Sequence, residues 1–121
     1  MERRAANNNC PMAHKAPPAP YYAVIFSSTL TNNAEGYSTM ADRMVELARE
    51  QEGFIDVESA ARTSEGSGIT VSYWRDLESI RKWKSVSEHA AAQRMGRDAF
   101  YRSYRLRIAR VEREYGFERG E

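Results

Sequence analysis

Residues 68–89 constrain the fold of this chain more than any other stretch, because the periodicity of their apolar residues changes partway along. In residues 69–74, β-branched and aromatic residues alternate with their neighbours at a period of two, which predicts a strand. Beyond them, Leu77, Ile80 and Trp83 recur at helical spacing. The stretch therefore predicts a strand that leads directly into an amphipathic helix.

The part of the chain before this stretch predicts a strand, a helix and a second strand. Residues 21–30 are dense in aromatic and branched residues on both faces, which is typical of a strand that is covered on both sides. An amphipathic helix follows a cap at Asn33, and Gly53 beyond its end is free to adopt a positive φ. The next strand, residues 54–62, is expected to pair antiparallel with the strand that begins at residue 68, through a polar hairpin loop.

The C-terminal part predicts helical segments and a last strand. Asp76 is expected to cap the helix that follows it, and Ser87 to cap a further helical segment. Helical structure is expected again over residues 98–104. The apolar pattern of the last strand, residues 106–115, changes phase near residues 108–110, where one extra residue would form a β-bulge. This order of elements predicts an α+β fold with a ferredoxin-like βαββαβ protomer.

The length and composition suit one domain and exclude several classes of protein. The 121 residues support a single core, expected over residues 21–118, behind a flexible N-terminal arm, residues 1–20, rich in Asn and Pro. Cys10 is the only cysteine, so no intramolecular disulfide is expected. A net charge of +1 argues against nucleic acid as a partner, and the apolar runs are too short to span a membrane. No apolar stretch follows the first basic residues as in a secretory signal, so a cytoplasmic location is expected.

The first strand also bears on the oligomeric state. Two helices cover only one face of a four-stranded sheet, so the other face would keep apolar side chains in water. A homodimer in which two such sheets pack face to face, as a dimeric α+β barrel, would bury them. The alternative is a monomer whose second face is covered by the N-terminal arm.

Several short motifs stand in order along the expected domain. They are Gly53-Phe54, residues 59–62 (SAAR), residues 68–74 (GITVSYW), Trp83-Lys84, Glu88-His89 and residues 115–117 (YGF). Taken together, they resemble those of one family, the antibiotic biosynthesis monooxygenase (ABM) domain, over about residues 21–118. The resemblance implies a dimeric α+β barrel of ferredoxin-like protomers. Characterised members include oxygenases that act on polycyclic aromatic anthrones without a cofactor, and haem-degrading monooxygenases.

The haem-degrading branch of the family is matched only in part. That branch is known for an asparagine on the first strand, a tryptophan on the second helix and a histidine beyond it. Trp83 matches the tryptophan, but the first-strand position falls near Phe26 or Ser27, and Gln93 stands near the position of the haem ligand. The resemblance therefore implies that this chain does not degrade haem, and no cofactor is expected.

The candidate site residues are one histidine and a set of aromatic residues. His89 is the only histidine within the expected domain, and it is the candidate catalytic acid or base; its structural alternative is to order the helix junction after Ser87. With no second histidine and no cysteine in the domain, no metal site is expected. The candidate binding residues for a small aromatic molecule, each with a structural alternative in the core, are Trp83, Trp74, Tyr73, Phe26 and Tyr101.

Three functional classes fit these residues. The first is a cofactor-independent monooxygenase acting on a small aromatic or polycyclic substrate, which needs only an apolar pocket and a base. The second is a non-catalytic dimeric ligand-binding or stress protein. The third is a haem-binding or haem-degrading protein, which a saturable shift of the Soret band would reveal.

Overall fold

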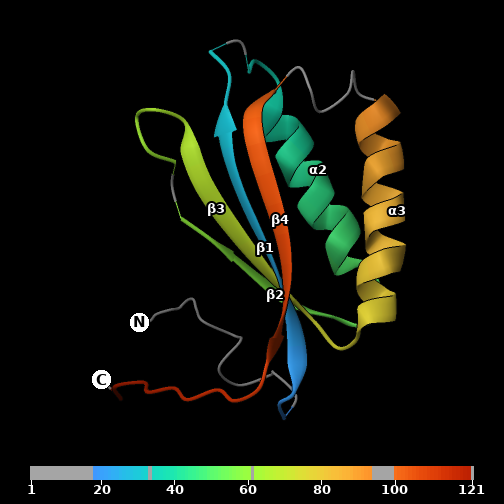
Figure 1. The fold of residues 1–121 in the computed structure, drawn as a ribbon, viewed down its shortest axis with the longest axis vertical. Coiled ribbons are helices and arrows are strands. Elements are labelled where there is room, and N and C mark those ends of the chain that lie inside the picture. Colours follow the sequence, from blue (N-terminus) through green and yellow to red (C-terminus); the bar gives the residue numbers. More distant parts are fainter. Residues whose placement is uncertain (1–17, 33, 61, 94–99, 121) are drawn as a thin grey trace.

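A computed structural model of the chain describes residues 18–32, 34–60, 62–93 and 100–120, with the side chains of residues 89–93 outside the description. The elements follow one another in the predicted βαββαβ order, which confirms the α+β ferredoxin-like fold (Figure 1). Their bounds are β1 (Tyr21–Leu30), α2 (Tyr37–Arg49), β2 (Phe54–Ser59), β3 (Ser67–Trp74), α3 (Leu77–Gln93) and β4 (Tyr101–Val111). No helix in the described part of the chain is long and apolar enough to cross a membrane.

The four strands form one antiparallel sheet in the order β2-β3-β1-β4. β1 is an inner strand, because it pairs with β3 along one edge and with β4 along the other. Val24, for example, lies opposite Ser72 of β3 and Ile108 of β4. The inner position explains why β1 is apolar on both faces: one face meets the helices, and on the other Tyr21 and Ala23 are only 2% and 5% exposed.

The core lies between the sheet and the two helices. Val24 of β1, Ala48 of α2, Trp74 of β3 and Ile80 of α3 form one buried cluster. Trp74 is 0% exposed, and its indole N–H donates to the Ser72 hydroxyl at 2.8 Å, so the one polar atom of this large ring is satisfied. The change of periodicity after residue 74 therefore marks the point where the chain passes from the sheet to the helix layer.

The structure corrects several expected element boundaries. α2 begins at Tyr37 after Gly36, whose φ is 91°, whereas the predicted cap Asn33 lies outside the described residues. α3 runs without interruption through Ser87, whose hydroxyl donates to the Lys84 carbonyl at 3.0 Å, so the prediction of a new cap there was wrong. An interior Ser can satisfy its hydroxyl on the preceding turn as well as it can cap a helix.

The last strand differs more from the prediction. β4 begins at Tyr101, so the expected helix is wrong for residues 101–104, and residues 94–99 lie outside the described residues. Its pairing with β1 is unbroken from Val111 to Ser103, which excludes a bulge near residues 108–110; the register shifts instead between Thr29 and Leu30 of β1, opposite the start of β4. Tyr104, Leu106 and Ile108 point to one face of β4, and Ala109 and Val111 point to the other. Both faces of this strand carry apolar residues, so the change of apolar phase in the sequence needs no extra residue.

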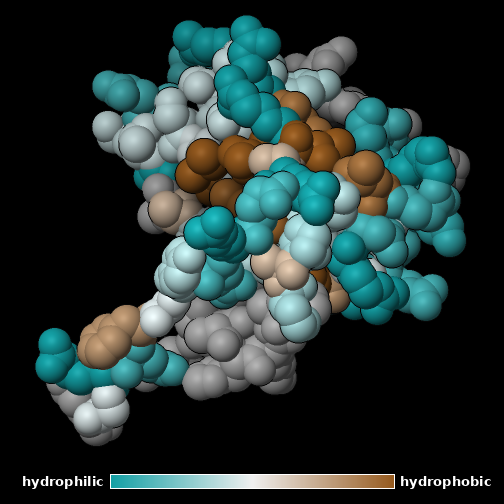
Figure 2. All heavy atoms as spheres, turned by 60° about the horizontal axis from the view of Figure 1, so that its bottom comes forward, coloured by the Kyte–Doolittle hydropathy of each residue, from teal (hydrophilic) through white to brown (hydrophobic). Residues whose placement is uncertain are grey.

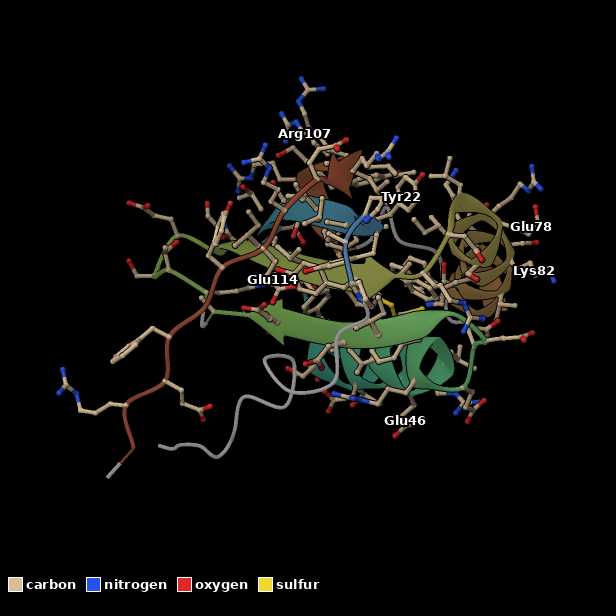
Figure 3. The ribbon with its side chains drawn as sticks, turned by 90° about the horizontal axis from the view of Figure 1, so that it is seen from below. Tyr22, Glu46, Glu78, Lys82, Arg107 and Glu114 are labelled. Atoms are coloured by element: carbon tan, nitrogen blue, oxygen red, sulfur yellow. The ribbon has the colours of Figure 1, made fainter. Side chains whose placement is uncertain are left out.

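The sheet has one face without helices. Figure 3 looks along the strands and shows α2 and α3 on one side of the sheet, with the C-terminal segment on the other. Directly paired residues share a face, so the registers assign the residues of the side without helices, called here the helix-free face. Its apolar residues are Tyr21, Ala23, Ile25, Ile69, Val71, Tyr73, Ala109 and Val111.

Candidate active-site cavity

A cavity of about 820 Å³ lies between the helix-covered face of the sheet and the two helices. This volume is within the range that drug-sized ligands occupy in proteins. Strands β1, β2, β3 and β4 supply its floor, with Val24, Phe26, Val57, Thr70, Ser72 and Leu106. Helix α2 supplies a second wall with Tyr37, Met40, Ala41, Met44, Val45 and Ala48, which are the stripe that amphipathic spacing turns towards the sheet.

One end of the cavity is built from aromatic rings. Phe26 of β1 packs against Tyr101 and Tyr104 of β4, with ring centroids 5.5 and 5.6 Å apart. Tyr37, the first residue of α2, meets Tyr101 edge to face at 5.7 Å. Offset and edge-to-face pairs are the favoured arrangements of such rings. These rings would present flat apolar surfaces to a bound molecule.

Trp83 of α3 forms the wall of the cavity on the opposite side from α2. Its ring packs on Trp74 with centroids 5.4 Å apart and planes tilted by 38°. Among the described residues, no acceptor lies within hydrogen-bond distance of its buried indole nitrogen. A buried donor without a partner is costly; within the described part of the chain, Trp83 is positioned by ring packing and not by a hydrogen bond.

The polar groups of the cavity come from α3 and from the strands, where Thr70 and Ser72 of β3 and Arg105 and Arg107 of β4 are among the lining residues. Lys84 of α3, and Ser87 and Glu88 one helical turn further on, line the cavity. The Lys84 ammonium lies 3.5 Å from the Glu88 carboxylate. On the α2 side, the Arg62 guanidinium donates to the Tyr37 hydroxyl at 2.9 Å and to the Ser28 hydroxyl at 2.7 Å. Arg62 thereby ties the β2–β3 loop to β1 and to the cavity wall.

The structure brings together three of the five predicted binding residues. Phe26, Trp83 and Tyr101 line the cavity, and Trp74 lies behind Trp83 in the core. Tyr73 lies outside the cavity, on the helix-free face. There burial, with help from Glu58, raises its pKa to about 12.

The predicted catalytic residue stays untested by the geometry. His89 belongs to the backbone of α3, directly after the cavity-lining Glu88, and its side chain lies outside the described residues. The described residues contain no group of three or more His, Cys, Asp or Glu side chains that could hold a metal ion.

Sequence reasoning missed several cavity residues. Tyr37, Met40 and Met44 were expected as a helix stripe that packs on the sheet, and the structure leaves a hollow beneath part of that stripe. Glu88 was singled out only as part of a motif, and so was Arg62, which lies behind the cavity wall and bonds to Tyr37. No local sequence pattern distinguishes a helix face that packs tightly against a sheet from one that leaves a cavity between helix and sheet.

Comparisons with known proteins agree with this architecture. The sequence profile of the family described as Antibiotic biosynthesis monooxygenase matches residues 20–95. An uncharacterized protein of Bacillus subtilis, YqjZ, is 49% identical over 104 residues, which cover 86% of this chain and 90% of that protein. The jasmonate monooxygenase ABM of Pyricularia oryzae is 29% identical over 92 residues, which cover 74% of this chain but only 43% of the longer fungal protein.

Solved structures of low sequence identity share the fold. SnoaB, a cofactor-independent oxygenase from Streptomyces nogalater, superposes with a TM-score of 0.61 at 11% identity, over 84% of this chain and 100% of that one. PA3566 from Pseudomonas aeruginosa superposes with a TM-score of 0.62 at 17% identity, over 82% and 99% of the two chains. With more than half of its length matched by the family profile, the chain belongs to the antibiotic biosynthesis monooxygenase family.

Proposed function

We propose that this chain is a cofactor-independent monooxygenase that oxidises a small aromatic or polycyclic substrate inside the cavity. The observation that carries the proposal is the cavity of about 820 Å³, with Trp83 on one side and the rings of Phe26, Tyr37 and Tyr101 on another. Flat aromatic molecules gain contact area and favourable ring geometry in such a site.

Two relatives support the chemistry. Family members include the jasmonate monooxygenase, which shares 29% identity with this chain, and SnoaB, a cofactor-independent oxygenase with the same fold. Neither fixes the substrate of this chain. Both are consistent with an oxygenase whose protein part supplies a pocket and a base.

The reaction needs no cofactor because the substrate itself can reduce O₂. A base removes a proton from an acidic CH₂ group, and the resulting carbanion gives one electron to O₂. The carbon radical and superoxide then combine and take up a proton, forming a hydroperoxide. Loss of water from the hydroperoxide leaves C=O, so CH₂ and O₂ become C=O and H₂O.

His89 is the proposed base, because an imidazole titrates near neutral pH. Glu88 is the second candidate, since it lines the cavity and a carboxylate is one of the groups that serve as general bases. Each candidate can be replaced by Gln, which keeps a polar side chain but cannot take up a proton at neutral pH.

The test uses anthrone, a tricyclic ketone with an acidic CH₂ group, and measures binding, oxygen uptake and formation of the quinone. Trp83→Phe keeps an apolar ring but removes contact area, so binding should weaken by about 1–2 kcal/mol. His89→Gln should spare binding and lower turnover by about 100-fold or more if proton removal limits the rate. Lys82→Gln, on the outer side of α3 in Figure 3, is the matched control and should change neither quantity.

Each other outcome has a defined meaning. Turnover that survives in a folded His89→Gln variant but falls in Glu88→Gln would assign the base to Glu88. Saturable binding without oxygen uptake would contradict the oxygenase and favour the non-catalytic ligand-binding protein. A fast, saturable loss of the Soret band with haem and a reductant would favour haem degradation instead. If anthrone neither binds nor reacts, the proposal fails for this substrate class.

A further inference from the structure

The Arg62 side chain lies behind the wall of the cavity and is held by hydrogen bonds to four oxygen atoms. Its guanidinium donates to the carbonyls of Ser28 and Gly66 at 3.2 and 2.6 Å, and to the hydroxyls of Ser28 and Tyr37 at 2.7 and 2.9 Å. Ser28 is buried, with 6% of its surface exposed. All four acceptors are neutral, so none of them offsets the positive charge of the guanidinium.

Gly68 of β3 leaves the space that this side chain occupies. A Cβ added at residue 68 would lie 2.9 Å from Cγ and 3.1 Å from Cζ of Arg62. Any larger residue would therefore push the guanidinium away from its acceptors. Two residues that the sequence marks only as letters of motifs, Arg62 in SAAR and Gly68 in GITVSYW, thus belong to one arrangement beside the cavity.

The Tyr37 hydroxyl is where this arrangement reaches the cavity. Tyr37 lines the cavity, whereas Arg62 is not among its lining residues. The hydroxyl accepts an N–H of Arg62, and no acceptor for its own proton lies among the described residues. A phenol hydroxyl has one proton to donate, so this proton is left for water or for a bound molecule. The guanidinium carbon also lies 5.0 Å from the centroid of the Tyr37 ring, which restricts the ring further.

These polar groups lie towards the end of the cavity that carries the candidate bases. Ser28 follows Phe26 on one face of β1, and such neighbours along a strand are about 7 Å apart. Figure 1 shows the start of α2 and the end of α3 at the same end of the sheet. Tyr37 on α2 and the turn of α3 that carries Glu88 and His89 therefore lie on opposite walls, towards the same end.

The surroundings of the Tyr37 hydroxyl are mostly apolar. Phe26, Met40 and Leu106 line the cavity with it. Figure 2 shows that apolar residues gather in the middle of the molecule, with hydrophilic residues around them. In a largely apolar pocket, the few polar groups fix the orientation of the ligand, and Tyr37 is placed to be such a group.

We propose that the Tyr37 hydroxyl, held by Arg62, donates a hydrogen bond to an oxygen atom on the ring system of the substrate. In the proposed oxygenase reaction, on which this assignment rests, the base on α3 takes a proton from the CH₂ group of the substrate. The electron pair of the broken C–H bond then spreads onto the carbonyl oxygen of anthrone, across the central ring. Tyr37 keeps its own proton throughout.

The hydrogen bond would favour the ionised substrate over the neutral one. A hydrogen bond is stronger when its acceptor is ionised, and the cation behind the Tyr37 hydroxyl polarises this donor further. A donor fixed in advance at the place where charge develops lowers the barrier to proton removal. The substrate class is therefore aromatic compounds with a carbonyl or phenol oxygen conjugated to the reacting carbon. Arg62, which acts through Tyr37, is a positioning residue.

The hydrogen bond can be tested without turnover by 2-naphthol, an aromatic phenol whose absorbance changes when it ionises. The pKa of bound 2-naphthol should be about one pH unit higher in Tyr37→Phe than in the wild type, because the bound phenolate loses its donor. Tyr22→Phe is the matched control. It removes the same hydroxyl from a tyrosine that packs on the core but does not line the cavity, so it should leave that pKa unchanged. Wild-type protein that does not bind 2-naphthol saturably, or equal values in the wild type and Tyr37→Phe, would overturn the proposal.

The role of Arg62 is tested in two backgrounds. Arg62→Gln should raise the pKa of bound 2-naphthol in the otherwise wild-type protein and leave it unchanged in the Tyr37→Phe protein, because the guanidinium then has no hydroxyl through which to act. A purely structural contact would not make the effect depend on Tyr37. Equal rises in both backgrounds would mean that Arg62 meets the ligand directly, which would overturn its positioning role. The Tyr37→Phe comparison stands by itself if Arg62→Gln does not fold.

Oxygen uptake with anthrone separates this assignment from the oxygenase reaction itself. Tyr37→Phe should lower turnover by about tenfold or more, since the enolate loses a fixed donor. Uptake that is unchanged in a folded Tyr37→Phe variant would contradict the role of Tyr37 and leave the oxygenase standing. Wild-type protein without oxygen uptake, but with the 2-naphthol difference intact, would contradict the oxygenase and leave Tyr37 as the group that binds a ligand oxygen.

Discussion

Two glycines near the ends of α2 share a positive φ but differ in the space around them. Gly36 and Gly53 have φ of 91° and 92°, a region that side chains disfavour. Around Gly36, no described residue beyond its two chain neighbours would come within 4 Å of an added Cβ, whereas at Gly53 that Cβ would meet the Cβ of Ser79 at 2.6 Å. Gly53 was expected to have a positive φ, which is confirmed, but its contact with α3 was not foreseen.

The pair of glycines separates backbone strain from steric overlap. Gly36→Ala should cost only strain, about 1 kcal/mol of the free energy of unfolding. Gly53→Ala adds overlap with a buried residue at the start of α3, so it should cost about 2–4 kcal/mol. Urea denaturation of both variants measures the difference. Equal losses would show that α3 shifts freely and that the contact is not important.

At the scale of the element, the N-terminus of α3 is stabilised by the cap that the sequence predicts. The Asp76 carboxylate accepts the Ser79 backbone N–H at 2.8 Å, which confirms the predicted N-cap. The Ser79 hydroxyl, and next its backbone N–H, lower the pKa of Asp76 below its ordinary value. A lowered pKa in the folded state means that the cap stabilises α3 above the unfolded pKa, and that this contribution is lost as the pH falls through the folded pKa.

Asp76→Ala should therefore lower the free energy of unfolding by about 1 kcal/mol at neutral pH. The deficit relative to the wild type should begin to shrink below the unfolded pKa of about 3.9 and should be smallest below the lower, folded-state pKa, where the wild-type carboxylate is protonated in both states. Asp76→Asn keeps a capping oxygen that does not titrate, so it serves as the control. A deficit that stays constant with pH would mean that the lost stability does not come from the charged cap.

The elements were predictable wherever the signal is local. Alternation in residues 69–74 and helical spacing after Leu77 are properties of neighbouring residues, and both were confirmed. The start of β4 at Tyr101 was missed because its arginines and tyrosines suit either element, and only pairing with β1 selects the strand. Whether Tyr73 points to the helix-covered or the helix-free face depends on which side of the sheet the helices pack. The sequence of the strand alone does not determine that side. Three of the five proposed binding residues line the cavity.

At the scale of the whole molecule, pairing of the helix-free faces would couple unfolding to dissociation. The Tm should then rise with protein concentration over about a hundredfold range, by mass action. Thermal unfolding followed by circular dichroism at each concentration measures this dependence. A wild-type Tm independent of concentration would indicate a monomer.

The strand order also has a consequence for how the chain is made. β1 is synthesised first but lies inside the sheet, and its Tyr21 pairs with Val111 at the end of β4. During translation, β1 cannot pair along one edge until β3 has been synthesised, or along the other until β4 has been synthesised. The hydrogen-bonding edges of this aromatic strand therefore remain unpaired during most of translation. Such non-local pairing slows folding and exposes a strand that other chains can capture. Nascent chains of this protein are therefore expected to need chaperones chiefly before β4 emerges.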